Sequence, residues 1–142
     1  MKVFILEDDK ERIDFLVKWV KTYIDHKADI YLAKTFAEAC DVFENHDYFD
    51  FMLLDHDLLF FFMPSDELET GYQVALAMRN GNVTYGGCII HSLNPEGALK
   101  MQKLLPNSIC IPISALGFKY DKIKFERKRK KGDLLKRALL FS

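Results

Sequence analysis

The chain has 142 residues, of which 49% are apolar and 29% are charged, and its net charge is −1. This composition is typical of one globular domain with a hydrophobic core, and it excludes a disordered chain. The longest apolar run, residues 58–63, is too short for a membrane span, and the first residues lack the pattern of a secretory signal, so we expect a cytoplasmic protein that contacts no membrane. Cys40, Cys88 and Cys110 are odd in number and widely spaced, which favours buried, reduced thiols.

Apolar strands and amphipathic helices alternate in the first half of the chain. Val3–Leu6 is a short apolar run that stops at an acidic triplet, which is typical of a strand buried on both faces. Thr35 and Glu38 form a capping box, in which each side chain satisfies a free backbone N–H at the start of a helix. In chain order we predict a strand at 3–6, a helix with apolar positions from 13 to 24, a strand at 30–33, a helix from 35 to about 45 and a strand at 49–54.

The same alternation continues in the second half. Thr70 and Gln73 form a second capping box, and Asn94 followed by Pro95 is typical of a helix N-terminus. Pro112 indicates that the last strand lies at the edge of the sheet, because proline has no N–H for pairing. In chain order we predict a long connection at 56–69, a helix that begins at 70 and stops at 81–82, a strand at 88–90, a helix from 94 to about 105, a strand at 109–113 and a final helix at 133–141.

This alternation predicts an α/β protein of one domain, a flavodoxin-like, doubly wound sheet of five parallel strands. We expect residues 1–118 to form this sheet and its helices, and the basic segment 119–142 to add a final helix to the same domain. The densest basic run, residues 127–131, is either the solvated side of that helix or a contact for nucleic-acid phosphates.

Polar clusters follow three of the predicted strands. In sheets of this kind ligands bind beyond the carboxyl ends of the strands, so these clusters are expected to share one edge. Several carboxylates at close range need a counter-charge, and oxygen ligands favour Mg²⁺ or Mn²⁺, with Zn²⁺ or iron if a histidine joins them. Singly, an acidic pair is also a common helix cap, and a lone histidine is more often structural. The clusters are Glu7–Asp9, Asp55–Asp57 and His91 with Ser92 and Asn94.

The same residues resemble two related families. Leu6–Asp9 and Phe51–Asp55 are similar to the acidic pair and the phosphoacceptor segment of response-regulator receiver domains. The fuller resemblance is to the cyclic-phosphate processing receivers within that superfamily. It rests on Asp8 and Asp9 with Arg12, on Leu54–Leu58, on Thr70–Tyr72 and on His91–Gly97.

The resemblance implies a hydrolase that acts on cyclic phosphodiesters of nucleotides or RNA ends. Ordinary receivers carry a lysine at the end of the fifth strand, where this chain has Ile113–Ala115, and this departure argues against a phosphorelay. The chain also departs from the cyclic-phosphate family at Phe60–Phe62, which either packs under its loop or against a partner, or stacks on a nucleobase.

The hypothesis for the site assigns a role to each polar residue. Asp8, Asp9 and Asp55 hold the cation, and Asp57 either joins them or orients a histidine. His56 and His91 act as base and acid, and Asp55 as a covalent acceptor stays open. Arg12, Ser92, Asn94 and Gly97 bind the substrate, the last three at a helix N-terminus. The alternative function is a non-catalytic signalling or nucleotide-binding module with Asp55 as phosphoacceptor.

Overall fold

The computed structural model describes residues 1–58 and 70–119, and the structural statements below concern these residues. Phe60–Phe62, the basic run 127–131 and the predicted final helix at 133–141 lie outside them. The elements in chain order are β1 (Lys2–Leu6), α1 (Lys10–Tyr23), β2 (Asp29–Ala33), α2 (Phe36–Asn45), β3 (Tyr48–Leu54), α3 (Gly71–Asn80), β4 (Thr84–Ile90), α4 (Pro95–Leu104), β5 (Ser108–Cys110) and the 3₁₀-helix η2 (Ile113–Leu116).

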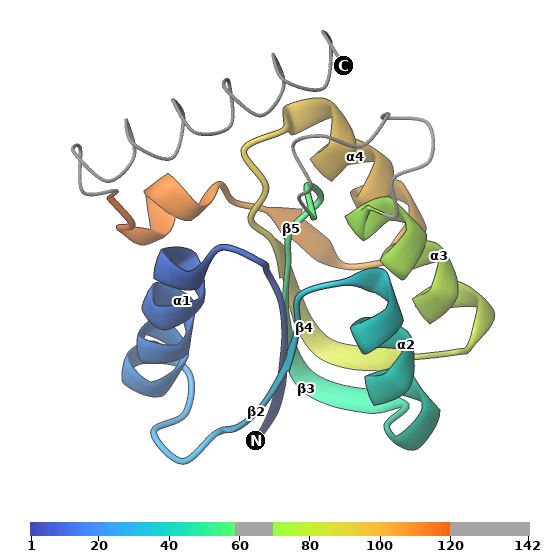
Figure 1. The fold of residues 1–142 in the computed structure, drawn as a ribbon, viewed down its shortest axis with the longest axis horizontal. Helices are drawn as coiled ribbons and strands as arrows, with labels where there is room; N and C mark the ends of the chain where they lie inside the picture. Colours follow the sequence, from blue (N-terminus) through green and yellow to red (C-terminus); the bar gives the residue numbers. More distant parts are fainter. Residues whose placement is uncertain (59–69, 120–142) are drawn as a thin grey trace, which may run out of the picture. The chain divides into compact units, whose positions relative to one another are not determined.

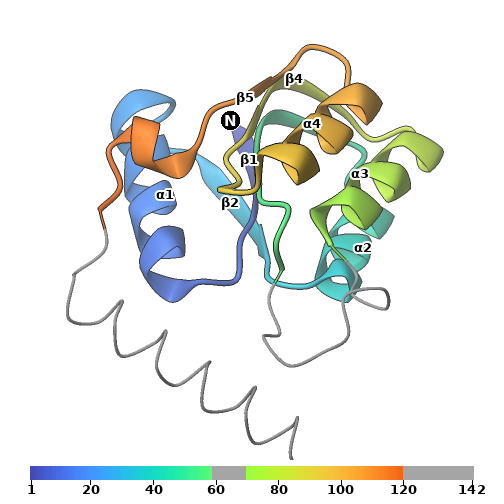
Figure 2. The same cartoon turned by 90° about the horizontal axis from the view of Figure 1, so that it is seen from above.

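The five strands form one parallel sheet in the order β2-β1-β3-β4-β5. In Figures 1 and 2, α1 and η2 lie on one face of this sheet, while α2, α3 and α4 lie on the other. Parallel strands need such crossover helices, and helices on both faces bury the sheet. The predicted flavodoxin-like, doubly wound sheet of five parallel strands is therefore confirmed.

The most completely buried strand residues lie in β1 and β3, two neighbouring strands in the interior of the sheet. Val3–Leu6 and Met52–Leu54 have no exposed surface, which explains why both runs are continuously apolar instead of alternating. The ring of Phe4 packs against those of Phe43 and Phe49, with centroids 5.0 and 5.4 Å apart. Because these buried strands pair with each other, the residues that directly follow them lie next to each other at the carboxyl edge of the sheet.

Two of the three predicted helix caps form. The hydroxyl of Thr35 accepts the N–H of Glu38 at 3.1 Å, and the Asn94 side chain accepts the N–H of Gly97 at 3.0 Å. The Glu38 carboxylate bonds the N–H of Lys34 at 2.7 Å, one residue before the position that the capping box predicts. Thr70 precedes α3 but makes no side-chain cap, so the second capping box is wrong.

The last strand is shorter than predicted. β5 ends at Cys110 instead of Ile113, because Pro112 cannot donate to a neighbouring strand and Ile113 already begins η2. Its predicted position at a sheet edge is confirmed.

Two further predictions, on membrane spans and on the cysteines, can also be compared with the structure. No helix within residues 1–58 and 70–119 is long and apolar enough to cross a membrane. Cys88 is buried and Cys110 is half-buried, and both are free thiols. Burial raises the pKa of the Cys88 thiol to about 12, so this group stays protonated.

Candidate functional site

Three carboxylates meet at the carboxyl ends of β1 and β3. Glu7, Asp8 and Asp55 each place one oxygen within 4.8 Å of the other two. The register explains this arrangement, since Leu6 pairs with Leu54 and the N–H of Asp55 donates to the carbonyl of Leu6 at 3.0 Å. The side chains that follow both strands are therefore neighbours.

The environment of Glu7 and Asp55 opposes the ionisation of their carboxyl groups. Glu7 has no exposed surface and Asp55 is 1% exposed. Burial, followed by the charge of Asp55, raises the pKa of Glu7 to about 9, and burial raises the pKa of Asp55 to about 6. Glu7 Oε1 and Asp55 Oδ2 form no hydrogen bond with any residue in the described ranges. A cation between them would stabilise the charged forms of both acids.

Asp9 and Arg12 lie beside this cluster and have structural contacts of their own. Asp9 Oδ2 accepts the N–H of Arg12 at 3.0 Å, which makes Asp9 the N-cap of α1. Arg12 Nε lies 3.3 Å from Glu7 Oε1, and its side chain is 9% exposed. Glu7 Oε2 accepts the N–H groups of Asp8 and Asp9 at 2.9 and 3.1 Å. The acidic pair of the cluster is thus Glu7 and Asp8, and Asp9 does not belong to it.

His56 and Asp57 form a hydrogen-bonded pair next to the cluster. His56 Nδ1 and Asp57 Oδ1 are 2.7 Å apart, and the backbone N–H of His56 donates to Asp55 Oδ1 at 2.8 Å. The hydrogen bond with His56 is the main reason why the pKa of Asp57 is lowered. The His56 side chain is 16% exposed. Asp57 thus contacts a histidine, and it is not a member of the Glu7–Asp8–Asp55 group.

The predicted substrate-binding residues after β4 form a turn and a helix start. The Ser92 hydroxyl accepts the N–H of Asn94 at 3.0 Å, and Asn94 in turn caps α4 through Gly97. Gly97 lies directly against the ring of His56, because a Cβ atom at this position would be 2.4 Å from its Cγ. Ser92, Asn94 and Gly97 therefore shape the backbone that supports His56.

His91 does not lie where the proposed proton transfer needs it. Its side chain has no exposed surface, and its Nδ1 is 3.8 Å from Glu7 Oε1. Burial lowers the pKa of His91 to about 3, and neither ring nitrogen forms a hydrogen bond within the described residues. The carbonyl of His91 accepts the N–H of Ile113 at 3.2 Å, where η2 begins. A neutral, enclosed imidazole does not fit the predicted exchange of protons with a substrate.

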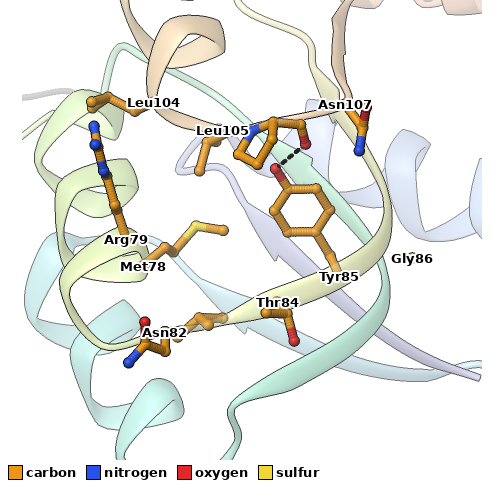
Figure 3. Close-up of a pocket in the computed structure, with 11 residues that line it drawn as sticks. Met78, Arg79, Asn82, Thr84, Tyr85, Gly86, Leu104, Leu105 and Asn107 are labelled. Atoms are coloured by element: carbon orange, nitrogen blue, oxygen red, sulfur yellow. Dashed lines mark hydrogen bonds between the residues drawn. The ribbon is translucent and has the colours of Figure 1, made fainter.

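A separate pocket of about 280 Å³ lies at the other end of the sheet, where β4 begins and α3 and α4 end (Figure 3). Apolar side chains, including Met78 and Leu105, form its floor, and Arg79 stands at its rim. The Tyr85 hydroxyl donates to the carbonyl of Pro106 at 2.6 Å. No residue of the predicted site lines this pocket.

Comparison with known proteins identifies the family. Residues 1–107 match the family model described as the Cyclic-phosphate processing Receiver domain. The chain belongs to this family. No curated protein matches its sequence.

Several solved structures share the fold of this cyclic-phosphate processing receiver domain. The N-terminal domain of a response regulator/sensory box/GGDEF 3-domain protein from Carboxydothermus hydrogenoformans is 16% identical, with a TM-score of 0.59 over 98% of this chain and 99% of that chain. A CheY-like receiver domain protein from Methanospirillum hungatei JF-1 is 14% identical, with a TM-score of 0.57 over 96% and 97%. A response regulator from Burkholderia pseudomallei, solved with a phosphorylated aspartic acid, calcium ion and citrate, is 12% identical, with a TM-score of 0.54 over 91% and 72%.

Glu7 lies in the predicted Glu7–Asp9 cluster, but the sequence-based hypothesis does not assign it as a ligand of the ion. The sequence signal for Glu7 is its position as the first acid directly after the buried run Val3–Leu6, where a side chain is still buried. Asp9 and Arg12 are three residues apart, which is the spacing between an N-cap residue and the residue whose N–H it accepts. This spacing indicates that Asp9 caps α1.

Proposed function

We propose that this receiver domain is a metal-dependent hydrolase of cyclic phosphodiesters, with cyclic nucleotides or RNA ends as substrates. The observation that carries the proposal is the position of the His56–Asp57 pair beside the Glu7–Asp8–Asp55 cluster at one edge of the sheet. A metal-binding set of carboxylates and an oriented imidazole are the parts that metal-assisted hydrolysis uses. Membership in a family named for cyclic-phosphate processing supports the substrate class.

The carboxylate cluster fits a divalent cation such as Mg²⁺ or Mn²⁺. Its ligand atoms are all oxygens, and two of them are buried without a hydrogen bond inside the described ranges. Glu7, Asp8 and Asp55 would hold the ion, which would polarise the phosphoryl oxygens of the substrate. The calcium ion in the Burkholderia pseudomallei response regulator lends support to a divalent cation on this fold.

His56 is our candidate for the base that removes a proton from the attacking water. It directly follows Asp55, its ring is partly exposed, and Asp57 stabilises the imidazolium that forms when it takes up a proton. Arg12 holds a positive charge against Glu7 and so offsets part of the negative charge of the cluster. We leave His91 out of the proton transfers because of its burial.

The second candidate function is a non-catalytic signalling module with Asp55 as phosphoacceptor, or a nucleotide-binding module. Asp55 follows the central strand β3, and its Oδ2 is free of hydrogen bonds with the described residues. The phosphorylated aspartic acid of the Burkholderia pseudomallei structure favours this alternative.

Turnover of defined substrates separates the two functions. We expect the protein with Mg²⁺ or Mn²⁺ to hydrolyse at least one member of a panel of 2′,3′- and 3′,5′-cyclic nucleotides and RNA ends with a 2′,3′-cyclic phosphate. His56→Gln and Asp55→Asn should each lower the rate by about 100-fold or more. The matched controls His26→Gln and Asp41→Asn change exposed residues and should keep the wild-type rate.

Two results would decide against hydrolysis. The absence of turnover with every substrate overturns the proposal, and so does a wild-type rate in His56→Gln. Labelling by acetyl phosphate of the wild type but not of Asp55→Asn, without turnover, would support the phosphoacceptor.

A further inference from the structure

We propose that Asn94 and Gly97, in the first turn of α4, are positioning residues that hold the His56 ring as the tautomer with its hydrogen on Nδ1. The lone pair on Nε2 is then the one available to take up a proton. The use of that lone pair in hydrolysis rests on the proposed function, whereas the tautomer itself does not.

The tautomer follows from the partner of Nδ1. Asp57 Oδ1 lies 2.7 Å from His56 Nδ1, and a carboxylate oxygen accepts hydrogen bonds but has no hydrogen to donate. Nδ1 must therefore carry the hydrogen. Among residues 1–58 and 70–119, the two side-chain contacts of the His56 ring are made at Nδ1, and neither occupies Nε2.

Asn94 connects this pair to α4. Its Oδ1 accepts the N–H of Gly97 at 3.0 Å, which fixes the orientation of the amide group. The amide nitrogen then lies 3.4 Å from Asp57 Oδ1 and 3.5 Å from His56 Nδ1. Since Nδ1 carries a hydrogen and cannot accept another, the amide donates to Asp57. A chain of contacts thus leads from the backbone of α4 through Asn94 and Asp57 to the imidazole.

Gly97 lies directly against the His56 ring. A Cβ atom at this position would lie 2.4, 2.5 and 2.6 Å from three atoms of the His56 ring, which is closer than any real contact. The ring therefore uses the space that a side chain would fill. Any larger residue must push the ring away from α4 and disturb its hydrogen bond with Asp57.

The competing explanation is that Asn94 only caps a helix, as Thr35 does for α2. Nuclear magnetic resonance of the ¹⁵N-labelled full chain distinguishes the two, because long-range ¹H–¹⁵N correlations identify the tautomer of each histidine. The spectra are recorded at pH 8, where an ordinary imidazole is neutral, without metal or substrate. We expect the Nδ1–H form to dominate for His56 in the wild type.

The variants are chosen to keep the fold. Asn94→Ser retains a good capping residue and loses the amide donor, and Gly97→Ala adds one methyl group against the ring. In both we expect the Nε2–H form of His56 to become a major species. Thr35→Ala removes a helix cap elsewhere and should leave the tautomer unchanged. If substrate turnover is found, Asn94→Ser should lower kcat by about 10-fold with little change in KM.

The spectra and the kinetics test different claims. A His56 tautomer that is unchanged in Asn94→Ser, or an Nε2–H form in the wild type, overturns this inference. A tautomer shift in a protein that hydrolyses no cyclic phosphodiester supports the positioning role and rejects only the proposed function.

Discussion

At the scale of the residue, Glu7 shows how one carboxyl group links the fold to the chemistry of the site. Burial and Asp55 raise its pKa, while Arg12 and the N–H of Asp9 lower it, and the balance lies near 9. In the unfolded chain the same group ionises near its ordinary value of 4.5. Folding therefore retains a proton on Glu7 over a wide pH range, and this proton has a measurable effect on stability.

Without divalent cations, we expect the free energy of unfolding to fall as the pH rises from 6.5 to 8. In this range unfolded Glu7 is ionised and folded Glu7 is protonated, so a rising pH favours the unfolded chain by up to about 1.4 kcal/mol per pH unit. Urea titrations across this range should show the slope in the wild type and in Glu44→Gln, an exposed control, but not in Glu7→Gln. Parallel profiles for Glu7→Gln and the wild type would contradict this account.

His91→Leu tests whether that imidazole is structural. Leucine fills a similar volume and removes two buried nitrogens that lack hydrogen bonds within the described residues, so unfolding free energy should change by less than about 1.5 kcal/mol. Turnover should stay within about 3-fold of the wild-type rate, since a fully buried ring does not touch the substrate. The wild type should also lose stability between pH 6.5 and 3, as unfolded His91 takes up a proton that the folded state rejects, and this loss should be smaller in His91→Leu. A folded variant as inactive as His56→Gln would show that His91 acts in the reaction.

At the scale of the element, local patterns predicted the strands and helices where local forces decide them. The continuous apolar run of β1 and the caps at Thr35 and Asn94 depend on neighbouring residues, and the structure has them as predicted. The end of β5 depends on its pairing with β4, whose residues are distant in sequence, and η2 begins at Ile113, where the prediction still had a strand. The lost cap at Thr70 has no such explanation in the structure.

Gly71 shows how closely α3 approaches the site. A Cβ atom here would lie 2.0 Å from the carbonyl oxygen of Asp55, and the N–H of Gly71 donates to the carbonyl of His56 at 2.7 Å. We expect Gly71→Ala to destabilise the protein by about 3 kcal/mol or more, because the atoms that a Cβ would meet, in Asp55 and His56, belong to the backbone. Chemical denaturation measures this change. Gly81→Ala, at the other end of α3, should cost under about 1 kcal/mol, and equal costs for both variants would refute the argument.

At the scale of the whole molecule, the sheet topology predicted which strand ends meet but not which side chains face one another. The convergence of β1 and β3 follows from the alternation of strands and helices. Which of Glu7 and Asp9 lies against Asp55, and which of His56 and His91 is fully buried, depends on packing by segments distant in sequence. For His91, one such segment is η2, whose Ile113 bonds its carbonyl and is itself 1% exposed.

Metal binding should appear as a gain in stability of the complete chain. We expect Mg²⁺ to raise the Tm, by the equivalent of about 2.7 kcal/mol at a concentration of 100 times its Kd. The gain should be larger at pH 8 than at pH 6, because protons on Glu7 and Asp55 compete with the ion. Differential scanning calorimetry should show no gain for Asp55→Asn and most of the gain for Asp57→Asn. A complete loss in Asp57→Asn would place Asp57 among the ligands.

The two edge strands of the sheet, β2 and β5, differ in length, and this difference affects how easily each could pair with a strand of another molecule. β5 offers open backbone groups over only three residues, and Pro112 prevents its extension, so it is a poor template for intermolecular pairing. β2, at the opposite edge, spans five residues, begins with the charged Asp29 and is followed by the charged Lys34. Among the described strands, any aggregation by strand addition would therefore start at β2.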